Sequence, residues 1–412
     1  MRDTKNIIAG LDIGTSKIVA AVAEVNADNK LNVIGVSAHP SRGLKKGVVV
    51  NIEATMASIQ KVLEEVEFIA GCKITHVYAG IAGSHIRSRD SNGMVAIKDG
   101  EVTQSDMDRV IEAAKAVPIA NDQRVLHVLP QEFIIDGQED VKEPLGMSGV
   151  RLEARAHIVT GAVSAADNIT KCVRRLGLEV QELVLQPLAS SYAVLSEDEK
   201  ELGVCLVDIG GGTTDIAVFS NGSIRHTAVI PIAGDQVTND IAMALRTPTK
   251  DAEELKRMYG VALRQMASSD TVIDVPSVGG DRSSRQLSQQ ILAEVIEPRV
   301  EELYTLVQAE LRRSGFEETL TSGIVLTGGC SSLKGMAELA EEVFHMPVRL
   351  GLPSSPLFSS LPDAVNNPRY STAIGLLLYG FQQIHREHQG KSQSGSFHGV
   401  WEKMRGWLSN NF

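Results

Sequence analysis

The stretch from Val207 to Asp215 restricts the fold of this chain more than any other. It reads Val-Asp-Ile-Gly-Gly-Gly-Thr-Thr-Asp and lies between the apolar runs 204–207 and 216–219. Apolar runs on both sides of a glycine cluster predict two antiparallel strands joined by a tight turn. Consecutive glycines let bare N–H groups approach an anion, and Asp208 would hold a cation beside it. The alternative is an ordinary hairpin with no ligand.

A second copy of the pattern favours the ligand site. Residues 11–16 read Leu-Asp-Ile-Gly-Thr-Ser and again lie between apolar runs. The repetition indicates two related halves, whose turns would grip a polyphosphate from both sides. Residues 10–17 lack the spacing of a Walker phosphate loop, and the turn leads into a strand, unlike a dinucleotide fingerprint.

Two further segments suit the nucleoside end of such a ligand. A buried-type strand, 324–327, ends in Gly328 and Gly329, where the backbone can lie flat against a nucleoside. Glu253 and Lys256 are spaced to project from one face of a predicted helix. The alternative for this charged face is plain solvation.

Composition excludes several classes of protein. The 412 residues have a formal net charge of −11, which argues against a general nucleic-acid binder. Four cysteines without a pairing pattern fit a reducing cytoplasm. There is no signal-peptide pattern at the N-terminus and no apolar run of the roughly 20 residues that span a bilayer. We therefore expect the bulk of the protein to be cytosolic.

The chain between the two halves has its own organisation. A composition shift over 84–161 predicts a small inserted α+β module, with short strands at 125–129 and 132–135. Two segments rich in small residues, 187–195 and 370–379, predict helices that cross closely between the halves. Such a crossing would form a hinge under the cleft.

The C-terminal tail predicts a membrane-binding helix. Residues 390–399 have the composition of a flexible linker. Beyond them both tryptophans of the chain fall on one apolar helical face, which suits the interface of an anionic membrane. Docking onto a partner groove or onto the parent domain is the alternative. The apolar face consists of Val400, Trp401, Met404, Trp407, Leu408 and Phe412.

Together these elements resemble the actin/Hsp70/sugar-kinase superfamily. The resemblance implies an α/β fold class: an actin-like two-lobed nucleotide-binding fold of duplicated ribonuclease H-like halves with an inserted α+β subdomain. Within it the chain resembles the FtsA family of bacterial division proteins, through residues 10–17, 41–52, 275–279 and the tail. The resemblance divides the chain into subdomain 1A (1–83, 162–197 and 357–385), the inserted subdomain 1C (84–161), subdomain 2A (198–227 and 306–356), subdomain 2B (228–305), a flexible linker (386–399) and a membrane-targeting helix (400–412).

The resemblance also implies ligands and partners. It implies ATP with Mg²⁺ between the lobes, and filaments at the division septum, on the cytoplasmic face of the inner membrane. It implies binding of the FtsZ tail through 228–305 and of later division proteins through 84–161, and no nucleic acid. Asp12 and Asp208 would hold Mg²⁺ through water. The cofactor-binding set would be Asp12, Gly14, Thr15, Ser16, Lys17, Asp208, Gly211, Gly212, Thr213, Thr214, Gly234, Glu253, Lys256, Gly328 and Gly329.

Other members of the superfamily offer alternative functions. A small-molecule kinase needs an aspartate base in a substrate pocket, and no residue can be singled out for that role. A chaperone-like ATPase needs a substrate domain, where this chain has a linker and one helix. The catalytic residue is unassigned, so we expect at most a weak ATPase.

Overall fold

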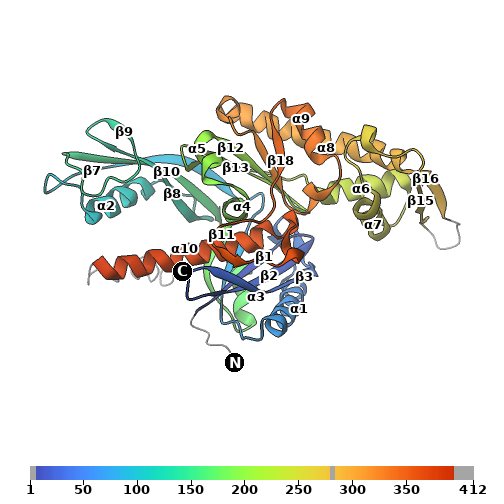
Figure 1. The fold of residues 1–412 in the computed structure, drawn as a ribbon, viewed down its shortest axis with the longest axis horizontal. Coiled ribbons are helices and arrows are strands. Elements are labelled where there is room, and N and C mark those ends of the chain that lie inside the picture. The colour runs from blue at the N-terminus through green and yellow to red at the C-terminus, as the bar shows by residue number, and fades with distance from the viewer. Residues whose placement is uncertain (1–5, 279–283, 394–412) are drawn as a thin grey trace.

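The computed structural model describes residues 6–278 and 284–393, with 386–393 as backbone only. Within these residues the chain forms two lobes, each built on one mixed sheet, and a smaller module inserted into the first lobe (Figure 1). The module lies at one end of the long axis. The hairpin of β15 (Val272–Val275) and β16 (Arg285–Ser288) lies at the other.

The sheet of the first lobe has the strand order β11-β6-β1-β2-β3-β19. Strands β1, β2 and β3 form an antiparallel meander, and β6 and β11 add in parallel. Alternate residues of β2 serve two cores: Ala20 and Val22 face one, Val19 and Ala21 the other. The strands are β1 (Ile7–Ile13), β2 (Lys17–Val25), β3 (Leu31–Pro40), β6 (His76–Ile81), β11 (Glu179–Leu185) and β19 (Phe358–Ser360).

The second lobe repeats this arrangement. Its order is β14-β13-β12-β17-β18, again an antiparallel meander, with β17 parallel to β12 as β6 is to β1. The predicted duplication of the halves is thus confirmed. The strands are β12 (Val204–Ile209), β13 (Thr214–Ser220), β14 (Ser223–Ile230), β17 (Ile324–Thr327) and β18 (Val348–Leu350).

Helices cover the outer faces of both sheets. In the first lobe the outer helices pack on the core that contains Ala20 and Val22. They are α1 (Ile52–Ala70) and α3 (Val163–Arg175), beside the short hairpin of β4 (Leu44–Lys45) and β5 (Val48–Val49). In the second lobe they are α6 (Gly234–Leu245), α7 (Thr249–Tyr259), α8 (Gln289–Ser314) and α9 (Met336–Phe344), with the short α5 (Glu197–Leu202) before β12.

Two helices lie between the lobes, as the small-residue segments predict. They are α4 (Gln186–Val194) and α10 (Ser371–Gln393). A Cβ atom on Gly375 would overlap with the carbonyl oxygen of Ala189, so the backbones touch at this crossing. One hydrophobic core contains residues of both helices and of both sheets.

Helix α10 is longer than expected. The sequence predicts a flexible linker from residue 386, but the helix continues to Gln393. Glutamine, arginine and glutamate are good helix formers and no proline interrupts them, so Gly390 alone does not end the helix.

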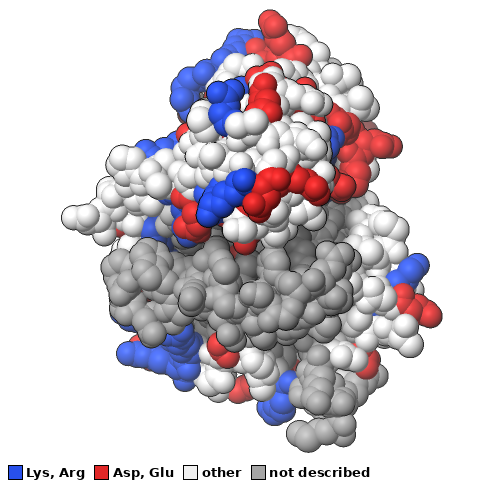
Figure 2. Space-filling model, turned by 90° about the vertical axis from the view of Figure 1, so that its left-hand side faces the viewer, with Lys and Arg blue, Asp and Glu red and all other residues white. Residues whose placement is uncertain are grey.

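The inserted module has its own sheet and its own core. The sheet order is β7-β10-β8-β9, and α2 packs on it where Gly93 leaves room for the helix backbone. The two short strands expected at 125–129 and 132–135 form one strand, because a bulge at Gln131 accommodates Pro130. Figure 2 shows acidic and basic side chains interspersed on this end of the molecule. The elements are β7 (Arg87–Ala96), α2 (Gln104–Lys115), β8 (Gln123–Ile135), β9 (Gln138–Val141) and β10 (Arg151–Ala162).

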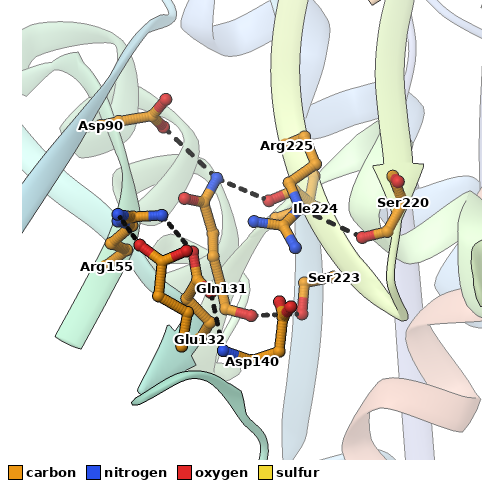
Figure 3. Close-up of polar contacts among 10 residues, drawn as sticks. Asp90, Gln131, Glu132, Asp140, Arg155, Ser220, Ser223, Ile224 and Arg225 are labelled. Carbon is orange, nitrogen blue, oxygen red and sulfur yellow. Dashed lines mark hydrogen bonds and ion pairs between the residues drawn. The ribbon is translucent and has the colours of Figure 1, made fainter. Parts of the chain in front are cut away.

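The module also contacts β14, the edge strand of the second lobe. The bulged Gln131 donates from Nε2 to the carbonyl oxygen of Ile224 (3.0 Å) and accepts at its own carbonyl from Ser223 Oγ (3.0 Å) (Figure 3). Gln131 is buried, so both bonds are shielded from water. We call this interface the module–lobe contact.

A buried histidine completes the module–lobe contact. His157 pairs through Nδ1 with Asp90 (2.7 Å) and through Nε2 with Thr227 Oγ1 (3.0 Å). Ser88 Oγ donates to the carbonyl oxygen of Thr227 (3.0 Å). Because the module belongs to the first lobe by chain connection, these bonds join it to both lobes.

Candidate functional site

Each lobe presents a glycine turn at the end of its first hairpin. In the first lobe the Gly14 N–H donates to the Lys17 carbonyl oxygen (3.1 Å). In the second lobe the Gly210 N–H donates to the Thr213 carbonyl oxygen (3.0 Å). The repeated sequence pattern therefore produces the same turn twice.

The two turns touch across the cleft. A Cβ atom on Gly211 would lie 2.8 Å from the Cβ of Ser16, and one on Gly212 would lie 2.7 Å from Thr15 Oγ1. Thr15 Oγ1 also accepts from the Gly47 N–H (2.9 Å), which adds a third segment to the site. Only glycine leaves enough space at this junction.

A cavity of about 40 Å³ lies between the turns. Pockets that enclose small molecules typically measure about 300–1,000 Å³, so the cavity in this structure is too small to enclose a nucleotide. The lining joins most of the predicted residues to several others. It includes Asp12, Gly14, Thr15, Ser16, Lys17, Asp208, Gly211, Gly212, Thr213, Gly328 and Gly329, and also Gly47, Gln186, Asp215, Pro368, Arg369 and Thr372.

Two buried carboxylates face each other across this cavity. Asp12 on β1 accepts from Gln186 Nε2 (3.0 Å), and Asp208 on β12 accepts from Ser190 Oγ (2.6 Å). Burial raises the pKa of Asp12 to about 6, against the lowering effect of Lys17. Burial also raises the pKa of Asp208, while the bond from Ser190 and the charge of Lys17 lower it.

A third carboxylate, Asp215, lies directly opposite Asp208 in the β12–β13 ladder. Its Oδ2 accepts from Thr213 Oγ1 (3.0 Å). Its Oδ1 is buried and has no hydrogen-bond partner among the described residues. Burial first, and then the charge of Asp208, raises the pKa of Asp215 to about 8.

The orphaned oxygen of Asp215 fits a bound cation, since a buried acceptor without a donor is costly. Within residues 6–278 and 284–393 no cluster of three or more His, Cys, Asp or Glu side chains is close enough to enclose a metal. Mg²⁺ fits the site with water and phosphate oxygens in its shell, which is its usual coordination. Asp12, Asp208 and Asp215 are the residues that could hold it.

Gly328 and Gly329 line the cavity after β17. Gly328 has φ +86°, and a Cβ there would overlap with Asp208 Oδ1. A residue with a side chain is therefore excluded by both its backbone conformation and the space available. This pair brings bare backbone next to the carboxylates.

Four predicted residues do not line the cavity of this structure. Lys256 Nζ binds the Gly234 carbonyl oxygen (2.9 Å), Thr238 Oγ1 (2.8 Å) and Glu253 (2.6 Å). An ammonium group has three donors, and Lys256 uses them on these three partners, which holds the loop at Gly234 in place. The four residues are Thr214, whose Oγ1 donates to the Ile232 carbonyl oxygen, and Gly234, Glu253 and Lys256.

The additional lining residues include Asp215, Gln186, Thr372 and Arg369, which the sequence analysis did not assign to the site. Asp215 had a signal, because it ends the second glycine motif in the strand that follows the turn. Gln186 and Thr372 begin the two crossing helices, and Thr372 Oγ1 lies 3.4 Å from Asp208. Arg369 precedes α10 and has no motif around it. Their roles depend on how the helices cross, which spacing alone does not predict.

The predicted membrane-binding residues 400–412 lie outside the described residues. Among the helices that the structure describes, none has the length and apolar character needed to cross a membrane.

The duplicated sheets, the facing glycine turns and the helices between them define an actin-like nucleotide-binding fold. The PilM–PilN type IV pilus biogenesis complex shares it, with a TM-score of 0.64, 19% identity and coverage of 91% of this chain and 98% of that one. An MreB protein of Spiroplasma citri bound to ADP matches with a TM-score of 0.58, 15% identity and coverage of 94% and 99%.

The chain belongs to the FtsA family of cell division proteins. It is 61% identical to the cell division protein FtsA of Pseudomonas aeruginosa over 98% of both chains, and 46% identical to that of Escherichia coli K12 over 99% of both. The family model for cell division protein FtsA matches residues 205–375. A model for the SHS2 domain inserted in FtsA matches 83–160, the stretch that forms the module. The predicted family and fold class are confirmed.

Proposed function

We propose that the cleft of this division protein binds ATP together with Mg²⁺. The converging carboxylates with the orphaned Asp215 oxygen carry the proposal, and MreB structures of the same fold contain ADP or AMPPNP. The turns at 14–17 and 211–213 would donate N–H and hydroxyl groups to the phosphates. Asp12 and Asp208 would hold Mg²⁺ through water.

The other predicted contacts belong to the nucleoside. Gly328 and Gly329 would lie against it, next to the loop at Gly234. Glu253 and Lys256 would act through that loop, because their charged groups are bonded to each other and to Thr238. Thr214 would act the same way through its bond to the carbonyl oxygen of Ile232, which lies between β14 and α6.

We further propose that the protein is a scaffold that forms filaments on the cytoplasmic face of the inner membrane. The tail residues Trp401 and Trp407 would insert at the lipid interface, with basic neighbours near anionic headgroups. Figure 1 shows α10 extending past the first lobe below the module, so the C-terminal end of this helix lies away from the glycine turns. A bound filament would thus hold its division partners at the septum.

The second lobe offers a surface for the FtsZ tail. An open groove of about 380 Å³ begins in the segment 228–232 and continues along α8. Its floor is apolar, and the exposed Arg313 lies at its rim, paired with Glu310 (2.5 Å). Such a groove suits a short peptide with apolar side chains. Later division proteins would bind the module at 84–161.

Co-sedimentation with anionic liposomes tests the scaffold. The full chain and a form ending at residue 399 are compared with and without Mg·ATP, and purified FtsZ is then added. We expect only the full chain to sediment, more of it with Mg·ATP, and to carry FtsZ with it. Trp407→Glu should abolish sedimentation. Asn410→Glu, which adds the same charge to the polar side of the tail, is the matched control. If both lengths stay in solution, the tail is not a membrane anchor.

A further inference from the structure

The cleft contains a cation that no sequence motif marks. Arg369 lies in the 3-10 turn Pro368–Tyr370, directly before α10, and lines the same cavity as the two glycine turns. A Cβ atom on Gly329 would lie 3.8 Å from the Cβ of Arg369. The stem of the arginine is therefore in contact with the glycine pair after β17.

Arg369 is held in place but its charge is unpaired. Its backbone N–H donates to Asn367 Oδ1 (3.0 Å), and its guanidinium carbon lies 5.0 Å from the centre of the Tyr370 ring. That distance is within the range of a cation–π contact. Across the described residues no carboxylate pairs with it. Arg349, by contrast, forms two bonds with Glu199 (2.6 and 2.7 Å).

The other charged residues that line the cavity indicate which kind of ligand Arg369 could bind. Asp12, Asp208 and Asp215 are acidic, and Lys17 is the cation whose charge favours the ionised forms of Asp12 and Asp208. A nucleotide would add phosphate charges to this acidic site. The basic residues that line the cavity are Lys17 and Arg369. Neither forms an ion pair within the described residues, but the charge of Lys17 acts on Asp12 and Asp208, which leaves Arg369 for the added phosphate charge.

We propose that Arg369 binds a phosphate of the nucleotide and makes the cleft select nucleotides over nucleosides. Guanidinium groups suit this role, because their planar fork donates two parallel hydrogen bonds to phosphate oxygens. The ring of Tyr370 contacts the guanidinium. This inference rests on the proposed nucleotide site and assigns it a specificity-determining residue.

Ligand affinities of the full chain test the proposal. Dissociation constants for Mg·ATP, Mg·ADP and adenosine are measured by displacement of a fluorescent ATP analogue. Arg369→Gln should weaken ATP and ADP by about tenfold or more and adenosine by less than twofold, as expected for a charge-assisted bond to phosphate. Arg369→Lys should restore part of the loss. Arg175→Gln, on the exposed side of α3, is the control and should leave every affinity unchanged.

The outcomes separate this inference from the proposed function. If the unaltered chain binds no ATP, the nucleotide site itself is wrong. If it binds ATP and Arg369→Gln binds equally well, the assignment of Arg369 is overturned. Equal losses for ATP and adenosine would show a contact with the nucleoside, which also overturns it. Tyr370→Leu, which keeps the charge but removes the ring, should weaken ATP by less than Arg369→Gln.

Discussion

Replacing Asp215 by asparagine should stabilise the empty protein, and increasingly so as the pH rises. Asp215 is buried opposite Asp208, and its Oδ1 has no partner among the described residues. Its ionised form is therefore disfavoured in the folded state, where its pKa is raised to about 8. Asparagine has nearly the same shape and carries no charge. The substitution removes the electrostatic penalty and keeps the packing.

The magnitude follows from the pKa values. Because the folded-state pKa of Asp215 lies above the unfolded value of 3.8, folding takes up a proton between these two values. The free energy of unfolding therefore falls as the pH rises through this window. A tenfold change in proton affinity corresponds to about 1.4 kcal/mol, so the penalty is about 2 kcal/mol at pH 5 and up to about 5 kcal/mol at pH 8.

Urea unfolding followed by circular dichroism, from pH 5 to pH 8 without nucleotide or Mg²⁺, measures the effect. We expect the stability difference between Asp215→Asn and the unaltered chain to grow with pH. Asp99→Asn, on an exposed turn of the module, is the control and should give a constant difference. A difference for Asp215→Asn that does not change with pH would refute the argument, because Asp215 would then have an ordinary pKa in the fold.

Two further substitutions test the contacts between the lobes. Gly375→Ala should destabilise the protein by about 3 kcal/mol in urea unfolding, because the new methyl group overlaps with the Ala189 backbone; unchanged stability would mean that α4 and α10 lie farther apart than in the structure. His157→Leu leaves Thr227 Oγ1 without its ring partner and should cost about 1–3 kcal/mol. Hydrogen exchange should then rise in β7 and β14 but not in β17, with the exposed His76→Leu as control; unchanged exchange in β14 would show that the histidine does not hold the module.

The parts of the site that were predictable are those determined by local chemistry. Asp12 and Asp208 end strands before glycine turns, and such turns constrain the backbone strongly enough to be recognised in the sequence. The crossing of α4 and α10 was also predictable, because only small residues allow helices to touch. Gln186 and Arg369 were not, since they reach the cavity only after those helices have packed.

Long-range contacts also explain why the strands of the inserted module were predicted less well than the glycine turns. The sequence predicts two short strands at 125–129 and 132–135, where the structure has the single strand β8. The bulge at Gln131 that joins them forms only by pairing with β10, so the sequence of β8 alone does not show it. The bulge then directs Gln131 toward the second lobe, a contact between residues far apart in the sequence. Long-range pairing of this kind leaves no local pattern to recognise.

The module–lobe contact connects the inserted module to both lobes, on the two sides of the cleft. The chain attaches the module to the first lobe, through β7 and β10, while Gln131 and His157 bond it to the edge strand of the second. The cavity between the glycine turns is too small to enclose a nucleotide, so it would have to widen for the proposed ligand to enter. A rotation of the lobes about α4 and α10 that widened it would also shear the bonds to β14. Filling of the cleft would therefore be coupled to the contact between the module and β14.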